Sequence, residues 1–378
     1  MPSQGTIDHR VELPPELACP RCRGPLRATA RDLVCAQHGQ AARRGADGAL
    51  LFADDSLYWG EIERASMRQI LEAARHTGWQ EALRRHLQPP SLLPYVQHPS
   101  RADWRVLVPL ERERTVSLDV GAGWGAVSFG LAPHVLRHYA VERVAERLEF
   151  IALRQQQDGV ANLVPVRADL HALPLCPGSL DLVAVNGVLE WAGLVDPEPT
   201  PGRRPRAPDV LQEAFLRQLH ALLRPGGWLY VGIENRYGRV FWRGTPDHQG
   251  LRFTSLMPRR LARAYTRLRA AHSPRTFVAE RDYRTWTYSL RGYRRLFARC
   301  GFRDLQAYAV VPGYNAPMQL VPLAQSGPFL YLTSRLRSPR RGLGPLRRAA
   351  HLLGAATGWE AQITSCYAFI LRTPEHGA

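Results

Sequence analysis

Residues 115–130, TVSLDVGAGWGAVSFG, contain the pattern that decides the fold. Apolar and β-branched residues lead into Asp119, glycines follow at 121, 123 and 125, and a run of small residues comes next. Glycine lets the backbone turn tightly and lets a ligand approach the main chain beside a helix N-terminus. The stretch therefore predicts a strand, a turn and a helix, with a nucleotide-like ligand at the turn. Glycine can also serve such turns for steric reasons alone, so other segments must decide.

Strand and helix patterns alternate between residues 104 and 235, at the spacing of a parallel α/β sheet. Helices are expected over 144–157 and after Pro208, with apolar strands between them. The chemically suggestive residues each stand at the carboxyl end of a strand: Asp119, Glu142, Asp169, Asn186 and Glu234. Ligands bind at that edge in open α/β sheets, so we expect these side chains to share one site.

These segments resemble a class I S-adenosylmethionine-dependent methyltransferase. DVGAGWG (residues 119–125) matches the family's E/DxGxGxG loop, and LLRPGGWLYV (222–231) resembles the segment that enters the fifth strand. The resemblance implies a Rossmann-like seven-stranded α/β sheet with helices on both faces, and S-adenosyl-L-methionine as cofactor. It also implies the cofactor-binding residues Asp119, Gly121, Gly123 and Gly125 around the methionine part, Glu142 on the ribose, Asp169 and Leu170 at the adenine edge, and Asn186 in the wall toward the acceptor.

An NAD(P)-binding oxidoreductase is the alternative reading of the same turn. Gly121-x-Gly123-x-x-Ala126 satisfies a relaxed dinucleotide fingerprint, and Glu142 stands at a suitable distance. Asp119 before the first glycine, Asp169 and the later Pro-Gly-Gly favour the methyltransferase. A methyltransferase-like binding subunit without catalysis is a third hypothesis, and the full set of cofactor residues argues against it.

Two ligand pairs near the N-terminus predict a metal site. Cys19-x2-Cys22 is followed after twelve residues by Cys35-x2-His38. Pairs on tight turns can converge tetrahedrally on one Zn²⁺, which would be structural because four protein ligands leave no open position. The segment resembles the small Trm112-like zinc ribbon, although His38 stands where that family has a fourth cysteine. Chance spacing in an arginine-rich tail is the alternative.

The candidate catalytic residues follow from the chemistry. Methyl transfer from a sulfonium is an in-line displacement, and a hydroxyl acceptor also needs a base within hydrogen-bond reach. His248 beside Asp247 is the first candidate, because histidine titrates in the useful pH range. Glu234 and Glu190 are further candidates, and Trp191 is expected in the acceptor wall or in ordinary packing. A hydrogen bond that stabilises its loop is the alternative role for His248.

Residues 236–289 form a long insertion rich in Tyr, Trp and Arg, which predicts a lid or substrate-binding subdomain. Its motifs at 233–238, 244–250 and 283–289 resemble bacterial methyltransferases associated with surface-polysaccharide and glycoconjugate assembly. That resemblance implies O-methylation of a glycan or small-molecule hydroxyl. Ribosomal RNA is the rival acceptor, since a zinc ribbon also precedes the methyltransferase domain in bacterial ribosomal-RNA guanine methyltransferases.

The net charge of +17 comes from 50 basic residues, all of them arginine. This bias fits the composition of a GC-rich genome as well as binding to polyanions. Arginines between 335 and 348, beside an apolar run at 351–356, predict a solvated basic loop or a peripheral contact with a membrane or anionic glycan. The chain has no run of eighteen uncharged apolar residues and no apolar signal region, which predicts a cytoplasmic protein.

These patterns divide the chain into three parts. We expect a zinc-ribbon-like domain at 1–55, a helical segment and linker at 56–103, and the class I methyltransferase domain at 104–378, with insertions at about 236–289 and 320–360. Apolar residues recur at helical spacing over 60–87, where Gly78 is expected to separate two helices. A closing antiparallel strand is expected over 365–372.

Overall fold

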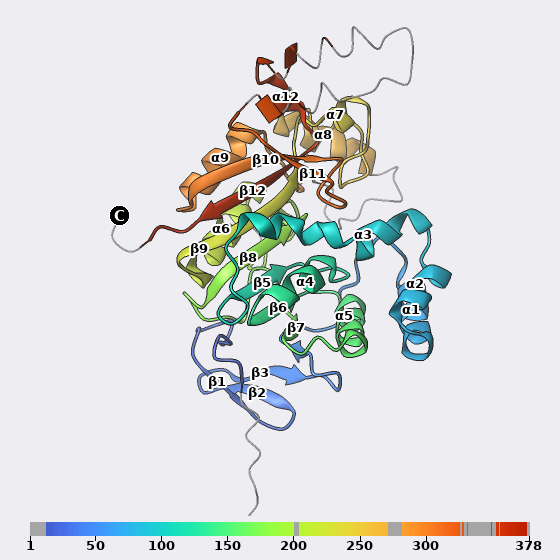
Figure 1. The fold of residues 1–378 in the computed structure, drawn as a ribbon, viewed down its shortest axis with the longest axis vertical. Helices are drawn as coiled ribbons and strands as arrows, with labels where there is room; N and C mark the ends of the chain where they lie inside the picture. Colours follow the sequence, from blue (N-terminus) through green and yellow to red (C-terminus); the bar gives the residue numbers. More distant parts are fainter. Residues whose placement is uncertain are drawn as a thin grey trace, which may run out of the picture.

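The computed structural model describes residues 13–199, 204–270, 282–325 and 356–375, with a few single positions between 327 and 354. The basic segment predicted at 335–348 lies outside the described residues. One sheet crosses the molecule, with the N-terminal strands at one end and the C-terminal part of the chain at the other (Figure 1). The described helices include none with the length and apolar composition that a membrane crossing needs.

All the described strands belong to one twelve-stranded sheet, in the order β1-β2-β3-β4-β7-β6-β5-β8-β9-β12-β10-β11. Strands β7, β6, β5, β8 and β9 run parallel, whereas β12 is antiparallel to its neighbours β9 and β10. This arrangement confirms the predicted α/β methyltransferase fold. The bounds are β1 Leu26–Ala28, β2 Asp32–Cys35, β3 Gly39–Arg44, β4 Leu50–Leu51, β5 Val116–Val120, β6 Arg137–Val141, β7 Leu163–Arg167, β8 Leu180–Asn186, β9 Leu223–Glu234, β10 Arg303–Val311, β11 Gln319–Pro322 and β12 Cys366–Arg372.

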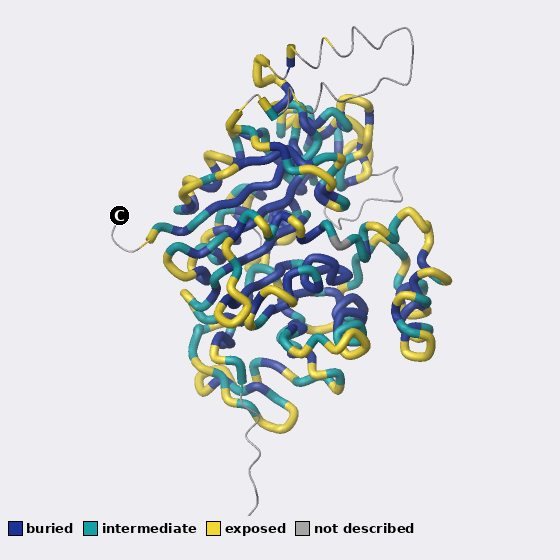
Figure 2. The backbone as a smooth tube through the Cα atoms, viewed as in Figure 1, coloured by how far each residue is buried: buried dark blue, intermediate teal, exposed yellow. Residues whose placement is uncertain are grey.

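Helices cover both faces of this sheet (Figure 1). On one face Phe215 and Phe297 pack with Leu118, and on the other Trp104 packs with Leu182. The most deeply buried backbone follows the central strands (Figure 2). The helices are α1 Arg64–Thr77, α2 Trp79–His86, α3 Leu93–Gln97, α4 Ala126–Leu131, α5 Ala145–Asp158, α6 Pro208–Leu222, α7 Arg239–Trp242, α8 Arg259–Ala270, α9 Leu290–Arg299 and α12 Trp359–Ile363, with 3-10 helices η1 Pro90–Leu92, η2 Pro99–Leu107, η3 Ala132–His134 and η4 Trp191–Gly193.

Two sequence expectations need correction. The Pro-Gly-Gly segment was expected to lead into the fifth strand, but β9 begins at Leu223 and includes that segment. The register with β8 shifts between Leu180 and Leu182, so the extra residues form an irregularity inside the strand. The proline-rich stretch after α2 was expected to be a linker, but it forms η1, α3 and η2. Each of these has proline in its first turn, a position where no backbone N–H donor is needed.

The predicted helix pair before the core is confirmed. Gly78 separates α1 from α2. The expected apolar positions are buried, among them Met67, Ile70, Leu71 and Leu83. Helices α1 and α2 both contact α5, the helix that connects β6 to β7 (Figure 1).

The N-terminal strands extend the edge of the main sheet. Strand β4 pairs in parallel with β7, with Leu50 opposite Val166. The buried carboxylate of Glu16 accepts hydrogen bonds from Arg137 at 2.8 Å and from the Tyr139 hydroxyl at 2.9 Å, both on β6. A paired, hydrogen-bonded buried charge fixes its neighbours in place. The cysteine-bearing strands are therefore joined to the core by backbone pairing and by this ion pair.

Candidate active site

The glycine-rich turn, residues 121–125, joins β5 to α4 at the carboxyl edge of the parallel strands. Gly121, Gly123 and Gly125 have φ values of 69°, 58° and 83°. A Cβ atom on Gly121 would lie only 2.6 Å from a methyl carbon of Val188. The turn thus needs glycine for its backbone conformation, and at Gly121 also for the close approach of the segment that follows β8.

Two buried acids hold this turn. The Glu142 carboxylate, just after β6, accepts hydrogen bonds from the backbone N–H of Gly123 and of Val144, each at 2.8 Å. Asp119 accepts a hydrogen bond from the Ser128 hydroxyl at 2.7 Å. Burial raises the pKa of Asp119 to about 6, although the bond from Ser128 opposes the rise. Both predicted acids therefore lie at the turn and fix its shape.

The remaining predicted cofactor residues stand on the neighbouring strand ends. Asp169 is exposed after β7 and accepts a hydrogen bond from the backbone N–H of His171 at 2.8 Å. Leu170, beside it, packs partly buried against the main core. Asn186 ends β8 and accepts a hydrogen bond from Tyr230 at 3.3 Å, while its buried side-chain N–H₂ has no hydrogen-bond partner among the described residues. Asn186 therefore keeps a donor for a ligand.

Sequence reasoning missed the residues that cover the turn from outside. The Trp124 indole donates to Glu61 at 3.1 Å, and Glu61 also pairs with Arg147 of α5. Tyr95 of α3 brings its hydroxyl to 3.8 Å from a Cβ placed on Gly123. These contacts join residues far apart in the chain, so no local motif indicates them. The segment expected to be a linker is thus part of the cofactor side of the site.

Glu190, Glu234 and His248 form a second group at the same edge, named here the carboxylate–histidine cluster. The Nε2 atom of His248 lies 3.2 Å from Glu234 Oε2 and 3.5 Å from Glu190 Oε1. Glu234 ends β9, Glu190 precedes η4, and His248 stands in the loop after α7. The side chains of His248 and Glu234 are 24% and 16% exposed, and that of Glu190 is fully buried. The atoms that face one another in the cluster, His248 Nε2, Glu234 Oε2 and both Glu190 carboxylate oxygens, are nevertheless buried.

The cluster separates the pKa values of its members. Burial raises the pKa of Glu190 to about 8, and the charge of Glu234 adds to the rise. Burial lowers the pKa of His248, but the charge of Glu234 outweighs it, and the pKa is raised to about 10. Burial likewise raises the pKa of Glu234, but the attraction of His248 prevails and leaves it below its usual value. A buried pair of opposite charge thus stands beside a neutral acid.

Asp247 is the predicted catalytic residue that the structure does not bring into this cluster. Its carboxylate accepts hydrogen bonds from the backbone N–H groups of Gln249 at 2.9 Å and Leu251 at 3.4 Å, and from the Thr254 hydroxyl. Such bonds build a tight loop. Among the described contacts, Asp247 therefore shapes the loop that presents His248.

Two tryptophans and one tyrosine support the carboxylate–histidine cluster. Trp191 lies edge-on to His248 with ring centroids 4.9 Å apart, and Trp59 lies 4.7 Å from Trp191. The Tyr314 hydroxyl donates to Glu234 Oε1 at 2.6 Å. Trp191 was expected here, whereas Trp59 and Tyr314 were missed because they come from distant parts of the chain. Tyr314 fixes Glu234 so that its other oxygen faces His248.

The four predicted metal ligands of the N-terminal strands meet in one place, named here the cysteine–histidine cluster. Cys22 Sγ lies 3.5 Å from Cys35 Sγ, and His38 Nδ1 lies 3.7 Å from Cys19 Sγ and 3.6 Å from Cys35 Sγ. Bonds of about 2.1–2.3 Å to a tetrahedral Zn²⁺ place neighbouring ligands at roughly these separations. The donor set and its spacing therefore fit zinc.

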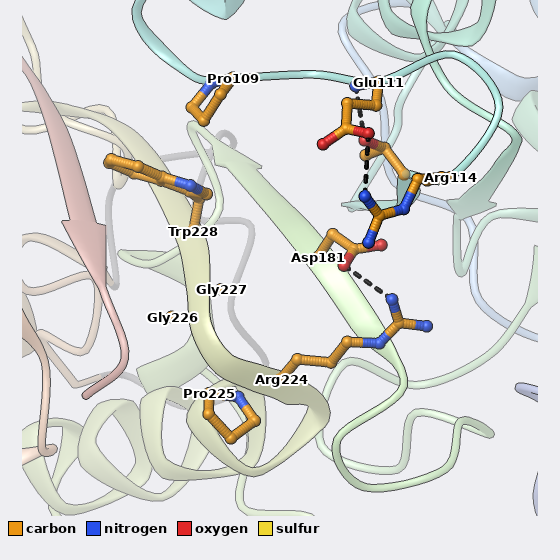
Figure 3. A pocket seen from close by; sticks show the side chains of 10 residues that line it. Pro109, Glu111, Arg114, Asp181, Arg224, Pro225, Gly226, Gly227 and Trp228 are labelled. Carbon is orange, nitrogen blue, oxygen red and sulfur yellow. Dashed lines mark hydrogen bonds and ion pairs between the residues drawn. The ribbon is translucent and has the colours of Figure 1, made fainter. Parts of the chain in front are cut away.

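A pocket at the opposite, amino-terminal edge of the sheet has a different character (Figure 3). It lies between the starts of β5, β8 and β9. Its charged side chains pair with each other, Arg224 with Asp181 at 2.8 Å and Arg114 with Glu111 at 3.2 Å. None of the predicted site residues lines it. The chemistry therefore concentrates at the carboxyl edge, as the fold leads one to expect.

Comparison with known proteins identifies the reaction. Residues 118–231 match the family model of the methyltransferase domain. With the strand order described above, this match shows that the chain contains a class I S-adenosylmethionine-dependent methyltransferase domain. The oxidoreductase alternative is thereby set aside. The match ends before Glu234, so it covers the cofactor side and only Glu190 of the carboxylate–histidine cluster.

Three solved structures illustrate the matches found among known structures. YcgJ from Bacillus subtilis is 13% identical, covering 74% of this chain and 100% of that chain, with a TM-score of 0.39. Phosphoethanolamine N-methyltransferase 2 from Haemonchus contortus is 12% identical, covering 84% and 62%, with a TM-score of 0.42. A SAM-dependent methyltransferase from Archaeoglobus fulgidus is 13% identical, covering 73% and 94%, with a TM-score of 0.39. No curated protein matches the chain.

Proposed function

We propose that the protein transfers the methyl group of S-adenosylmethionine to a hydroxyl oxygen of a glycan or small-molecule acceptor. The observation that carries this proposal is the place of the carboxylate–histidine cluster. Val188 touches the glycine-rich turn at Gly121, and Glu190 follows two residues later. The cluster, in which the Glu234 carboxylate can accept a proton, thus follows closely on the segment that touches the turn proposed to hold the methyl donor.

A hydroxyl acceptor is the kind that needs such a group. As the new O–CH₃ bond forms, the S–CH₃ bond breaks, and its electron pair stays on the sulfur of S-adenosylhomocysteine. The hydroxyl proton must leave in the same event, and a base within hydrogen-bond reach assists this. The side chains of Glu234 and His248 are partly exposed, whereas that of Glu190 is fully buried. We assign proton removal to this pair, with Trp191 as a wall of the acceptor site.

The cofactor would be held by the residues around the turn. We assign Glu142 to the ribose hydroxyls, because its carboxylate lies at the turn and bonds to the Gly123 N–H. The Asn186 amide has a donor without a hydrogen-bond partner among the described residues, and we assign it to the wall between cofactor and acceptor. The proposed set is Asp119, Gly121, Gly123, Gly125, Glu142, Asp169, Leu170 and Asn186.

The cysteine–histidine cluster is proposed to hold a structural Zn²⁺. Cys19, Cys22, Cys35 and His38 supply four ligands within 4.8 Å of one another. A closed four-ligand set leaves no position for a substrate, so the ion would hold the N-terminal strands together without taking part in methyl transfer. Elemental analysis of the purified protein tests this, with about one zinc per chain expected.

The first experiment is calorimetric titration with S-adenosylhomocysteine, with NADH as the control ligand. S-adenosylhomocysteine alone is expected to bind. Methyl-labelled S-adenosylmethionine is then offered with lipid-linked glycans, simple glycosides, amines and ribosomal RNA. We expect label in an alkali-stable methyl ether of a glycan or glycoside. Label in RNA or in an amine would overturn the proposed acceptor class.

A matched pair of variants ties the reaction to the site. Glu234→Gln should bind S-adenosylhomocysteine normally and lose methyl transfer. Glu149→Gln changes a half-exposed carboxylate on α5 that pairs with Arg75, and should leave both unchanged. Equal activity in the two variants would remove the cluster from the mechanism.

A further inference from the structure

We infer that the carboxylate–histidine cluster is a binding site for a divalent cation, which holds the acceptor hydroxyl. The inference rests on the proposed function, because the acceptor would be a hydroxyl at this edge of the sheet. It goes further, since it assigns a metal to a group that could also act as a plain acid–base pair. Three observations support it.

The first observation is the spacing of the donor atoms. His248 Nε2 lies 3.2 Å from Glu234 Oε2 and 3.5 Å from Glu190 Oε1, and all three ligand atoms lie within 4.8 Å of one another. Cations with bonds of about 2.1 Å place neighbouring ligands about 3.0 Å apart in octahedral geometry and about 3.4 Å apart in tetrahedral geometry. The two nitrogen–oxygen distances therefore fit ligands on adjacent positions of one small cation.

The second observation is the state of Glu190. Its side chain is fully buried, and neither carboxylate oxygen has a hydrogen-bond partner among the described residues. Buried carboxylates are normally hydrogen-bonded, paired or bound to a metal. The cationic neighbour of Glu190 in the cluster is His248, whose Nε2 is also close to Glu234. A cation between the three groups would satisfy Glu190 and Glu234 together.

The third observation is the support of the cluster and the number of its ligands. Tyr314 donates to Glu234 Oε1, which leaves Oε2 directed at His248. Hydrogen bonds of this kind orient the ligands of metal sites. The three ligand atoms are buried, and a four-coordinate cation bound by them keeps one further position, which the acceptor hydroxyl would take. Three protein ligands with open positions are typical of a catalytic metal, in contrast to the closed cysteine–histidine cluster.

The ligand types indicate which cations would bind. Carboxylate oxygens with one imidazole suit Mn²⁺, Fe²⁺, Zn²⁺ or Mg²⁺, and the absence of thiolates disfavours Cu⁺. A hydroxyl bound to such a cation loses its proton more readily. The proton leaves to water, the oxygen takes the methyl group, and the sulfur keeps the electron pair of the broken S–CH₃ bond. No electrons are transferred to or from the metal.

Manganese binding to the full-length protein tests the inference. Mn²⁺ is measured by electron paramagnetic resonance in the presence of S-adenosylhomocysteine, because this hard ion binds thiolates poorly and so reports on the carboxylates. We expect one Mn²⁺ per chain. Glu190→Gln and His248→Asn should each weaken its Kd by about 10- to 100-fold. Glu149→Gln, the half-exposed control on α5, should stay within about twofold of the wild type.

The outcomes separate this inference from the proposed function. S-adenosylhomocysteine titration first shows that each variant is folded. If wild type and Glu190→Gln hold Mn²⁺ equally or not at all, while glycan methylation proceeds without added cation, the cation site is wrong and the acid–base pair remains. If Mn²⁺ binds but no hydroxyl is labelled, the proposed acceptor class fails and the cation site stands. If Mn²⁺ accelerates methylation in the wild type and not in Glu190→Gln, the result supports both the cation site and the proposed acceptor class.

Discussion

The two clusters of metal-type ligands differ in how the chain builds them. The cysteine–histidine cluster comes from two short pairs within residues 19–38, on adjoining turns of one small set of strands. The carboxylate–histidine cluster gathers residues from 190 to 248, on the ends of two long strands and an inserted loop. The first can form wherever its local segment folds. The second exists only when the whole sheet is assembled.

Their contacts differ in the same way. The first cluster has four ligands and no open position, which suits an ion that holds strands together. The second has three groups, one of them fully buried without a hydrogen bond, and two with partly exposed side chains. Unsatisfied buried polar groups cost stability and persist mainly where function needs them. The comparison therefore assigns stability to the N-terminal cluster and chemistry to the one at the strand ends.

Replacing the histidine of each cluster with alanine gives the largest expected difference between the two clusters. His248→Ala should lower kcat/KM for methyl transfer by about 10²- to 10⁴-fold, because a group that assists proton removal is lost. His38→Ala should leave it within about twofold. The measurement is label transfer from S-adenosylmethionine, with S-adenosylhomocysteine titration to confirm that both variants are folded. Similar losses in the two variants would break the comparison.

The sequence predicted the cofactor side of this site better than the acceptor side. The turn at 121–125 and the acids at 119 and 142 belong to local patterns or to strand ends, which a single sequence reveals. The alternation of strands and helices also predicted the parallel sheet, and the family resemblance implied the helices on both of its faces. The cysteine–histidine cluster was equally readable, because its ligand spacing is local.

The acceptor side depends on contacts that no local pattern contains. Tyr314 reaches Glu234 from a loop after β10, and Trp59 reaches Trp191 from before α1. Glu190 was a weak candidate, because its importance lies in its burial without a partner, which only the folded chain shows. Asp247 was paired with His248 on adjacency alone, whereas its carboxylate bonds within its own loop.

Removal of one thiolate gives the next largest effect. Cys22→Ser should reduce bound zinc from about one per chain to well below that, because metal binding and folding of such a site are coupled. We expect faster hydrogen exchange of the backbone over residues 17–52. Binding of S-adenosylhomocysteine should be retained, since the core sheet has its own buried contacts. If hydrogen exchange became faster only in the glycine-rich turn, the result would contradict the stabilising role of the cysteine–histidine cluster.

The sheet between the two clusters has its own pH dependence. His138 of β6 is fully buried and shares a hydrogen bond of 2.8 Å with the Ser117 hydroxyl. Burial lowers its pKa from 6.5 to about 3. The folded state therefore binds fewer protons than the unfolded state, and stability present above pH 6.5 is lost as the pH falls toward 3. By pH 5 the loss is about 2 kcal/mol.

This acid sensitivity must be separated from loss of zinc, since acid also protonates thiolate and imidazole ligands. His138→Gln keeps a partner for Ser117 and removes the titrating group. Denaturant unfolding between pH 7 and 5 should show a smaller loss of stability in this variant than in the wild type. If the free energy of unfolding fell equally with pH in the variant and the wild type, the acid effect would be assigned to the cysteine–histidine cluster instead.

The smallest predicted effect concerns the support of the carboxylate–histidine cluster. Tyr314→Phe removes the hydrogen bond to Glu234 Oε1 and leaves the ring in place. A hydrogen bond to a charged group contributes about 1.5 kcal/mol, so kcat should fall by about tenfold with little change in the affinity for S-adenosylhomocysteine. Tyr308→Phe is the matched control, because its hydroxyl donates to Gln306 on the same strand, away from the cluster. If Tyr314→Phe instead lowered thermal stability and left kcat unchanged, its bond would be structural. The two clusters would then be alike in needing no support from distant parts of the chain.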